Sequence, residues 1–370
     1  MKSLYIMSLL GIAAMLGSCK NQSHEFESSQ QQAVYFPIQY PVRTLVLGET
    51  RLDNSVDLQN AFHVGVCVGG GYSNETSWTV DYEVDPSLIP SEGMKVKNTE
   101  GKDVTLKVLP DYYYTLEPEN SVVIPKGSFN GLIRVNMSDA FFEDKDACSF
   151  DSDVIYVLPM KITDSSCPKV LWGTPTVENP NLFDISHWVA TDQPRFFTLF
   201  GVKFINMFDG VFFHRGKQFK MGVNDEYTLD KEFAYDEFEE GQTANVTTLL
   251  RNRSVYDRMG EWQDGNKYQT VLDFSEKEYG EGIIKVSAPE GASYRVFGTG
   301  KYYDSTTQFA KEHGSWLVDP QTGKETPHLT MTLDYFVEGL NGENYEFQDT
   351  LVFRNNNVKF ETFTPIITAE

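Results

Sequence analysis

Aromatic side chains near predicted turns are the residues of this chain whose type and setting could bind a ligand. Trp262 lies between two glycines in a polar segment, the pair Tyr302 and Tyr303 precedes Asp304, and Trp316 follows a His-Gly-Ser sequence. Sugar rings have an apolar face that packs on Trp or Tyr, while neighbouring polar side chains bind the hydroxyl groups. These four aromatic residues are the predicted ligand-binding residues, and the alternative is that each is a core aromatic.

Acidic residues offer a second kind of chemistry because they are numerous and clustered. One cluster lies within residues 139–153, and the other contains Asp230, Glu232, Asp236, Glu237, Glu239 and Glu240. A glycosidase holds two carboxylates roughly 5 to 9.5 Å apart across a cleft, which sequence spacing cannot establish. With 53 Asp and Glu in the chain, solvated surface is the favoured interpretation. Neither a Gly-x-Ser-x-Gly elbow nor a Walker-type loop occurs, so we expect no catalytic residue and no enzyme activity.

Metal and cofactor motifs are missing from the sequence. The six histidines are scattered, no Cys-x-x-Cys pair occurs, and residues 139–153 lack the spacing of an EF-hand loop. Beyond Cys19 the cysteines are Cys67, Cys148 and Cys167, an odd number, so at least one has no partner within the chain. A disulfide between Cys148 and Cys167 is left open. The sequence predicts neither a metal site nor a cofactor.

The charge balance excludes one class of partner. The chain has 31 Lys and Arg against 53 Asp and Glu, which gives a formal charge of -22. Nucleic acids and anionic membrane surfaces would repel such a chain unless a local basic patch intervened, and the sequence contains none. We therefore expect no nucleic-acid partner.

The first residues read as an export signal. A weakly basic start precedes a short apolar run, and residues 1–18 end in Leu16-Gly17-Ser18 before Cys19. This ending resembles the bacterial lipobox, in which the cysteine is lipidated and becomes the new N-terminus. The resemblance implies that Cys19 carries the lipid and is the only attachment to a membrane; the alternative is a secretory signal with a chance cysteine. Residues 19–32 are polar and are predicted to form a flexible tether.

The rest of the chain predicts a mainly β protein with two domains. Residues 33–167 read as short strands separated by Pro, Gly and Asn, at the spacing of an Ig-like sandwich. Residues 168–370 contain further strands joined by short turns, as in an antiparallel β-barrel. They resemble a C-terminal domain that often follows such an Ig-like domain, and this resemblance implies a lipocalin-like shape. The clearest strand lies near the end, where Leu329, Met331, Leu333 and Tyr335 alternate with more polar neighbours.

Four short segments of the first domain carry a family resemblance. They are Val34–Pro37, Tyr40–Arg43, Tyr113–Leu116 and Val123–Gly127. These segments resemble an uncharacterised Ig-like domain of Bacteroidetes surface lipoproteins, and the resemblance covers roughly residues 33–165. It implies a protein of a polysaccharide-utilisation locus. In that family the domain is sometimes fused to a family 18 glycoside hydrolase, but the acidic motif of that enzyme, Asp-x-x-Asp-x-Asp-x-Glu, does not occur in this sequence.

Together these features suggest a lipid-anchored protein of the outer membrane, exposed at the cell surface. The leading hypothesis is non-catalytic binding of a polysaccharide or oligosaccharide, which the protein presents to a SusC/SusD-type importer. The alternative is a structural or adhesive surface protein in which the Ig-like domain is a spacer. A glycan binder should expose a row of two or three aromatic residues, whereas an adhesin should show a broad apolar patch or an open edge strand.

Overall fold

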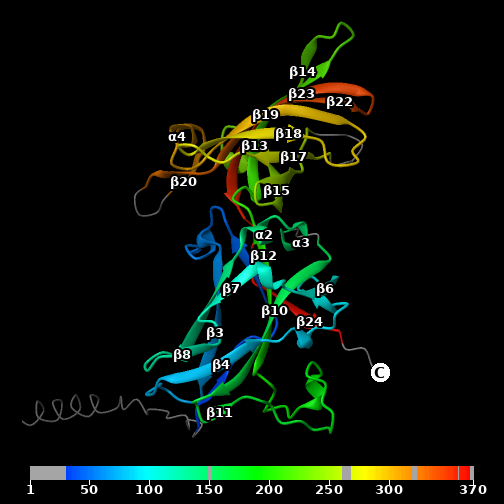
Figure 1. The fold of residues 1–370 in the computed structure, drawn as a ribbon. Coiled ribbons are helices and arrows are strands. Elements are labelled where there is room, and N and C mark those ends of the chain that lie inside the picture. The colour runs from blue at the N-terminus through cyan, green and yellow to red at the C-terminus, as the bar shows by residue number, and fades with distance from the viewer. Residues whose placement is uncertain (1–30, 149–151, 261–267, 319–322, 357, 367–370) are drawn as a thin grey trace, which may run out of the picture.

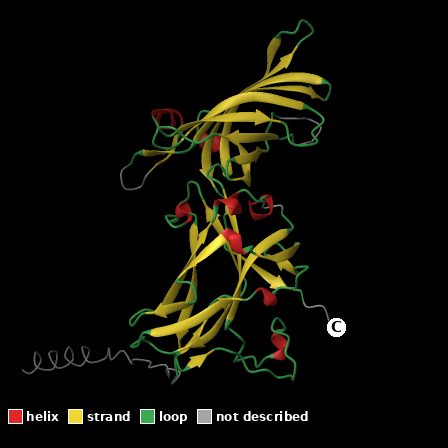
Figure 2. Ribbon diagram, in the orientation of Figure 1, coloured by secondary structure: helices red, strands yellow, loops and turns green. Residues whose placement is uncertain are grey.

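The computed structural model describes residues 31–148, 152–260, 268–318, 323–356 and 358–366. Its strands form two lobes that are stacked end to end (Figure 1). Strands dominate both lobes, and the helices are short (Figure 2). The structure confirms the predicted mainly β fold, with a sandwich followed by an antiparallel barrel.

Two sheets build the first lobe. The smaller sheet has the order β11 (Lys169–Val170), β1 (Ala33–Tyr35), β3 (Ala61–Gly69), β9 (Asn130–Met137) and β7 (Tyr114–Glu117). The larger sheet has the order β12 (Phe197–Ile205), β2 (Pro41–Val46), β24 (Glu361–Pro365), β5 (Met94–Asn98), β6 (Asp103–Val108), β10 (Val154–Ser165), β4 (Trp78–Val84) and β8 (Ser121–Ile124).

The larger sheet closes on itself because β12 also pairs with β10. Its first six strands therefore form a ring around a small apolar core that includes Val42, Leu106 and Phe363. A larger core lies between the two sheets and includes Phe62 and Phe204. Strand β2 contributes to both cores, since its alternate side chains point to opposite faces.

The second lobe is a closed antiparallel barrel. Its nine-stranded sheet has the order β14 (Tyr227–Phe233), β13 (Gly210–Met221), β15 (Gln242–Leu250), β16 (Arg253–Tyr256), β17 (Thr270–Phe274), β18 (Glu281–Ser287), β19 (Arg295–Tyr303), β22 (Thr330–Leu340) and β23 (Glu343–Asn355). Because β13 also pairs with β23, all strands except β14 form one ring. Strands β14 and β15 share one edge of β13, which they divide near Gly216.

Short helices and a short hairpin complete the two lobes. The hairpin of β20 (Ser315–Val318) and β21 (Glu325–Pro327) packs beside α4 (Gln308–His313), next to the barrel. Helices α2 (Asp139–Phe142) and α3 (Lys145–Cys148) lie on the first lobe, where it faces the barrel (Figure 1). The single-turn 3-10 helices are η1 (Asp57–Gln59), η2 (Pro86–Leu88), η3 (Asp111–Tyr113), η4 (Ile185–His187) and η5 (Phe238–Glu240).

The sheets divide the chain differently from the predicted boundary between residues 167 and 168. Strand β12 pairs with β2 and β10, and β24 pairs with β2 and β5, so both belong to the first lobe. The barrel is thus inserted between two strands of the sandwich. Local sequence patterns do not reveal this arrangement, because it depends on pairing between strands far apart in the chain.

Side chains fix the two lobes to each other. The carboxylate of Glu49 from the first lobe accepts a hydrogen bond from the Leu329 backbone N–H at 2.7 Å and lies 2.8 Å from His328 Nδ1. On the other side of the junction, Arg251 lies 3.1 Å from the carboxylate of Asp139. These contacts tie a loop of the sandwich to the barrel wall. Among the described residues, no helix is long and apolar enough to span a membrane.

Candidate functional site

Of the four residues predicted to bind a ligand, Tyr302, Tyr303 and Trp316 lie within the described residues. Cys19 and Trp262 lie outside the described residues. Tyr302 is only 1% exposed, and its hydroxyl donates to the Ser275 carbonyl at 2.6 Å. Tyr302 is therefore a core aromatic, which is the alternative that the sequence left open for it. Its ring occupies the space beside Gly282, where a Cβ atom would lie 2.2 Å from the ring.

Tyr303 and Trp316 are half-buried and have packing partners. The ring of Tyr303 stacks on Phe309 of α4, with the ring centres 4.1 Å apart. The indole of Trp316 packs edge-on against Phe213, and its Nε1 donates to the Phe353 carbonyl at 2.9 Å. These contacts hold α4 and β20 against the barrel. The thiols of Cys67, Cys148 and Cys167 are free, so the disulfide left open by the sequence is not formed.

A buried polar cluster occupies the middle of the barrel. Asp349 Oδ1 lies 2.9 Å from His214 Nε2, and Oδ2 accepts from the hydroxyls of Tyr256 at 3.1 Å and Tyr335 at 2.9 Å. Burial, followed by the charge of Asp349, raises the pKa of both tyrosines well above the usual value. Their hydroxyls stay protonated donors at neutral pH. Gly216 leaves room for the carboxylate, since a Cβ atom there would lie 2.5 Å from Asp349 Oδ1.

A pocket of about 380 Å³ lies beside this cluster, where β14 and β15 divide the edge of β13. His214, Tyr235 and Gln242 are among the residues that line it. Glu232 and Glu240 from the predicted acidic cluster also line it. Within the described ranges, no group of three His, Cys, Asp or Glu side chains is placed to hold a metal ion.

Four apolar side chains and one glutamate, each on a different strand, form a row across the outside of the barrel. The strand register pairs Phe297 with Phe336, Phe336 with Glu346, Glu346 with Phe219, and Phe219 with Leu229. None of these five side chains is buried, and Phe297 is 48% exposed. Register partners in an antiparallel sheet point to the same face, so the row lies on the outer surface.

The rings of this row are close enough to act together. Those of Phe297 and Phe336 are nearly parallel at 21°, with centres 5.6 Å apart. Tyr227 packs edge-on against Phe336 at 5.7 Å. We call Phe297, Phe336, Tyr227 and Phe219 the aromatic row. From Phe297 on β19 to Phe219 on β13 it spans three strand spacings, which give a length of about 14 Å.

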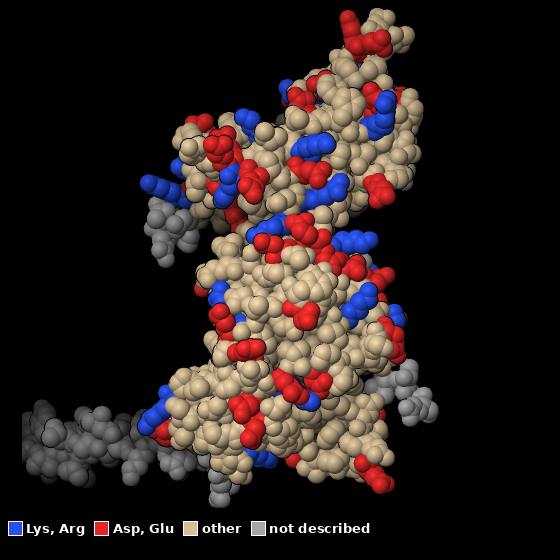
Figure 3. Space-filling model, viewed as in Figure 1, with Lys and Arg blue, Asp and Glu red and all other residues tan. Residues whose placement is uncertain are grey.

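Polar side chains border the aromatic row. Two residues further along four of the strands, and three along β14 where its register shifts, the pairing aligns five exposed polar residues, which are Thr299, Asp334, Gln348, Lys217 and Glu232. On the other side, Arg295 forms an ion pair with Glu338. Lys and Arg do not gather into one patch on the face shown in Figure 3, where acidic and basic groups are interspersed. The row thus combines ring faces with hydrogen-bonding groups of both signs.

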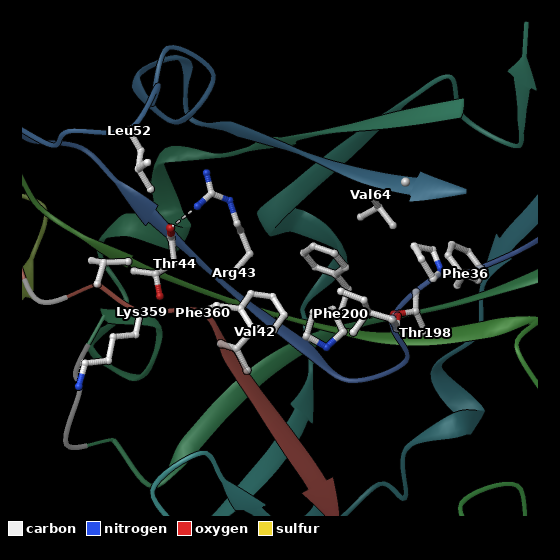
Figure 4. A pocket seen from close by; sticks show the side chains of 15 residues that line it. Phe36, Val42, Arg43, Thr44, Leu52, Val64, Thr198, Phe200, Lys359 and Phe360 are labelled. Atoms are coloured by element: carbon white, nitrogen blue, oxygen red, sulfur yellow. Dashed lines mark hydrogen bonds between the residues drawn. The ribbon is translucent and has the colours of Figure 1, made fainter. Parts of the chain in front are cut away.

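The sandwich contains a separate apolar pocket of about 400 Å³ (Figure 4). It lies along β2, between the start of β3 and residues 358–360, and Phe36, Val42, Val64, Phe200 and Phe360 supply apolar walls. Figure 4 shows Arg43 and Leu52 on one side of this space and Phe36 and Thr198 at one end. We call it the sandwich pocket.

Sequence reasoning missed both the aromatic row and the sandwich pocket. The predicted alternation of Leu329, Met331, Leu333 and Tyr335 already implies that the next residue, Phe336, lies on the opposite face of its strand. What the sequence could not supply was the register that brings these rings together. The sandwich pocket combines residues more than 300 positions apart, and no local pattern indicates such a pocket.

Comparison with known proteins gives a family for part of the chain. A family model described as an N-terminal domain matches residues 27–169. No curated protein matches the chain. A solved structure from Bacteroides ovatus, described as being of unknown function, is 26% identical with a TM-score of 0.74. The match covers 90% of this chain and 98% of that chain.

Two further structures from Bacteroides ovatus are more distant. One is of unknown function, with 15% identity, a TM-score of 0.42 and coverage of 89% of this chain and 97% of its own. The other is a multidomain protein including DUF1735, with 13% identity, a TM-score of 0.40 and coverage of 87% and 94%. The family match and the 26% identical structure fit a protein of the Bacteroidetes.

Proposed function

We propose that this protein is a surface lipoprotein that binds a glycan without modifying it. In this proposal Cys19 carries the lipid that attaches the chain to the outer membrane. The barrel binds a polysaccharide or oligosaccharide and presents it to a SusC/SusD-type importer. The aromatic row is the observation that carries the proposal, because it is the feature that distinguishes a glycan binder from the other hypotheses.

The chemistry of the aromatic row suits a sugar chain. Exposed ring faces bind the apolar side of a pyranose, and bordering amide, carboxylate and ammonium groups bind its hydroxyls. Phe297 and Phe336 supply the rings, while Asp334, Gln348 and Lys217 supply the polar groups. A length of about 14 Å gives room for a short line of sugar units.

The alternative is a spacer or adhesive role, and the stacking of the two lobes favours it (Figure 1). The contacts of Glu49 and Arg251 hold the barrel at the end of the sandwich, away from the N-terminal strand β1. Such an arrangement would carry a binding surface outward from the membrane. A spacer would show the same shape but would bind no glycan through the aromatic row.

Affinity electrophoresis of the recombinant mature chain against plant, microbial and host polysaccharides tests the proposal. We expect at least one polysaccharide to retard the protein, and the Phe297→Ala/Phe336→Ala double variant to lose most of that retardation. The matched control is Tyr279→Asn, which removes a 95% exposed ring elsewhere on the same lobe. Asn suits the positive φ of 53° at this position.

Three outcomes decide between the hypotheses. Retardation lost in the double variant and kept in Tyr279→Asn supports glycan binding by the aromatic row. No retardation by any polysaccharide favours the spacer. Release of new reducing ends during incubation would show an enzyme and contradict the non-catalytic part of the proposal.

The lipid anchor has its own test. We expect the full-length chain to partition into the detergent phase of Triton X-114 after expression in a Bacteroides host. Cys19→Ala should move the protein to the aqueous phase, because a diacylated cysteine supplies the membrane affinity. Equal partitioning of the two forms would contradict the lipidation of Cys19.

A further inference from the structure

We propose that the end of the sandwich at which β1 begins rests on the lipid bilayer, with exposed aromatic and apolar side chains at the boundary between headgroups and acyl chains. This inference rests on the proposed lipidation of Cys19 and adds a second membrane contact to that anchor. The lipid holds the protein, and this surface orients it. The contact is independent of glycan binding by the aromatic row.

The position of β1 decides which end of the molecule lies near the membrane. Strand β1 begins at Ala33 and pairs with β11, at the end of the sandwich farthest from the barrel (Figure 1). The predicted tether, residues 19–32, joins this point to Cys19. A flexible chain of that length has an r.m.s. span of about 20 Å. The lipid anchor therefore keeps this end of the sandwich close to the bilayer.

Two connections beside the start of β1 carry exposed aromatic rings. Tyr72 is 68% exposed, and the carbonyl of the next residue, Ser73, accepts from Gln32 Nε2 at 3.0 Å. Phe129 is 39% exposed, and its carbonyl accepts at 3.0 Å from the N–H of Val68, a residue that pairs with β1. Both rings therefore lie close to the point where the tether joins the sandwich.

A third connection, residues 171–195 between β11 and β12, lies at the same end (Figure 1). The Leu171 N–H donates to the Val34 carbonyl at 3.1 Å, so this connection starts beside β1. The next residue, Trp172, is 45% exposed, and Ile185 is 76% exposed. We call Tyr72, Phe129, Trp172 and Ile185 the tether-end patch.

The chemistry of the tether-end patch suits a membrane interface. Trp and Tyr are enriched where headgroups meet acyl chains, because each ring has an apolar body and a polar tip. Neighbouring charges are paired, with Lys126 3.3 Å from Glu75 and Lys169 4.0 Å from Asp192. The contact thus depends on burial of apolar surface and not on attraction to anionic lipids, which the chain charge of -22 opposes.

The tether makes such a small patch sufficient. Four side chains would hold a free chain on a membrane only weakly. A second contact made by an already anchored chain is intramolecular, and a short flexible linker gives it a high effective concentration. The patch therefore needs only a small affinity of its own to keep the sandwich upright, with the barrel directed away from the bilayer.

Quenching of tryptophan fluorescence by phosphatidylcholine brominated on its acyl chains tests the proposal. The mature chain, with a hexahistidine tag in place of Cys19, is bound to vesicles that contain a nickel-chelating lipid, so the anchor does not depend on lipidation. Because bromine on an acyl chain quenches only rings that enter the bilayer, we expect quenching in the wild type. Trp172→Phe should lose at least half of that quenching. Tyr72→Ser/Ile185→Ser keeps the Trp172 reporter and should reduce the quenching at least twofold.

The matched control is Leu58→Ser/Tyr112→Ser, which should be quenched like the wild type. These side chains are 58% and 66% exposed and belong to η1 and η3 of the same lobe. Both helices lie where that lobe meets the barrel, since η3 packs on α2 and Arg251 of the barrel lies 3.3 Å from Asn60 beside η1. The control therefore removes similar apolar surface from the opposite end of the sandwich.

Three outcomes would overturn the proposal. The first is vesicle-bound protein whose Trp172 is not quenched, and the second is equal quenching of the wild type and Tyr72→Ser/Ile185→Ser. The third is a dimer of the free chain, seen by analytical ultracentrifugation, that this double variant abolishes, because a second copy would then cover the patch. The detergent-phase test of Cys19→Ala is unaffected by these results, so the two proposals can fail separately.

Discussion

The barrel centre and the sandwich pocket each bury a polar side chain, and they treat it in opposite ways. In the barrel, the carboxylate of Asp349 receives contacts from His214, Tyr256 and Tyr335 and lies among large apolar side chains. In the sandwich pocket, Thr44 Oγ1 is buried without a partner beside a cavity of about 400 Å³. A buried group that has its hydrogen-bond partners stabilises the fold, whereas a buried hydroxyl without a partner lowers the stability of the fold.

The largest expected effect comes from breaking the barrel centre. Asp349→Ala should lower the free energy of unfolding by about 3 to 5 kcal/mol, because three buried partners lose their acceptor. Urea denaturation followed by circular dichroism measures the change. The control is Asp334→Ala on the exposed face of β22, which should change stability by less than about 0.5 kcal/mol. Equal stability of the two variants would show that the polar cluster does not support the barrel.

The second prediction concerns pH and the turn that enters the barrel. Burial raises the pKa of Asp209 from 3.8 to about 6, although hydrogen bonds from the Thr248 N–H and Oγ1 lower it. Between about pH 4 and 6 the folded chain therefore holds more protons than the unfolded chain, and the free energy of unfolding falls as pH rises through this window. Relative to Asp209→Asn, the wild type should lose about 1 to 3 kcal/mol across it.

Denaturation of both proteins at several pH values measures this difference. The comparison with Asp209→Asn removes the contribution of the other acids, which titrate in both proteins. A stability difference that stays constant from pH 4 to 6, or one that rises with pH, would contradict the raised pKa of Asp209.

The third prediction concerns the contacts that join the two lobes. Glu49→Ala removes the acceptor for the Leu329 N–H and the partner of His328, so it should cost about 1 to 2 kcal/mol. Because these contacts join the lobes, scanning calorimetry should show a broader or divided unfolding transition. Glu75→Ala removes an exposed ion pair with Lys126 and should leave the transition unchanged. A single sharp transition in Glu49→Ala would mean that the lobes unfold together without this contact.

Local patterns in the sequence predict the strands of both regions. Alternation of apolar residues predicted a strand at 329–336, and in β22 the side chains of Met331, Leu333 and Tyr335 are buried. Pro125 and Gly127 suit a turn, and β8 and β9 lie on either side of them. These predictions succeed because side-chain period and turn chemistry are local properties.

Pairing between distant strands explains what the sequence did not predict. The aromatic row depends on the register of five strands, and the sandwich pocket depends on β24 returning to β2. Tyr302 looked like a loop aromatic beside Asp304, but its position in β19 points inward, where Gly282 leaves space for the ring. A shift of one residue in the alternation of a strand moves every side chain between the core face and the surface face. The glycines at alternate positions of this strand have no side chains that would show which face is apolar.

The smallest expected effect comes from the same type of substitution, Thr to Val, made at one buried position in each lobe. Thr44→Val replaces a buried hydroxyl that has no partner, so it should change the free energy of unfolding by less than about 1 kcal/mol or increase it slightly. Thr248→Val replaces a buried hydroxyl that donates to Asp209 at 2.8 Å and accepts from the Asn206 N–H at 3.0 Å, so it should cost about 1 to 3 kcal/mol. Both residues are at most 3% exposed, so exposure does not account for a difference between them. If the two variants lose equal stability, the Thr44 hydroxyl has a partner of its own in the folded chain, and the contrast between partnered groups in the barrel and an unpartnered one in the sandwich fails at Thr44.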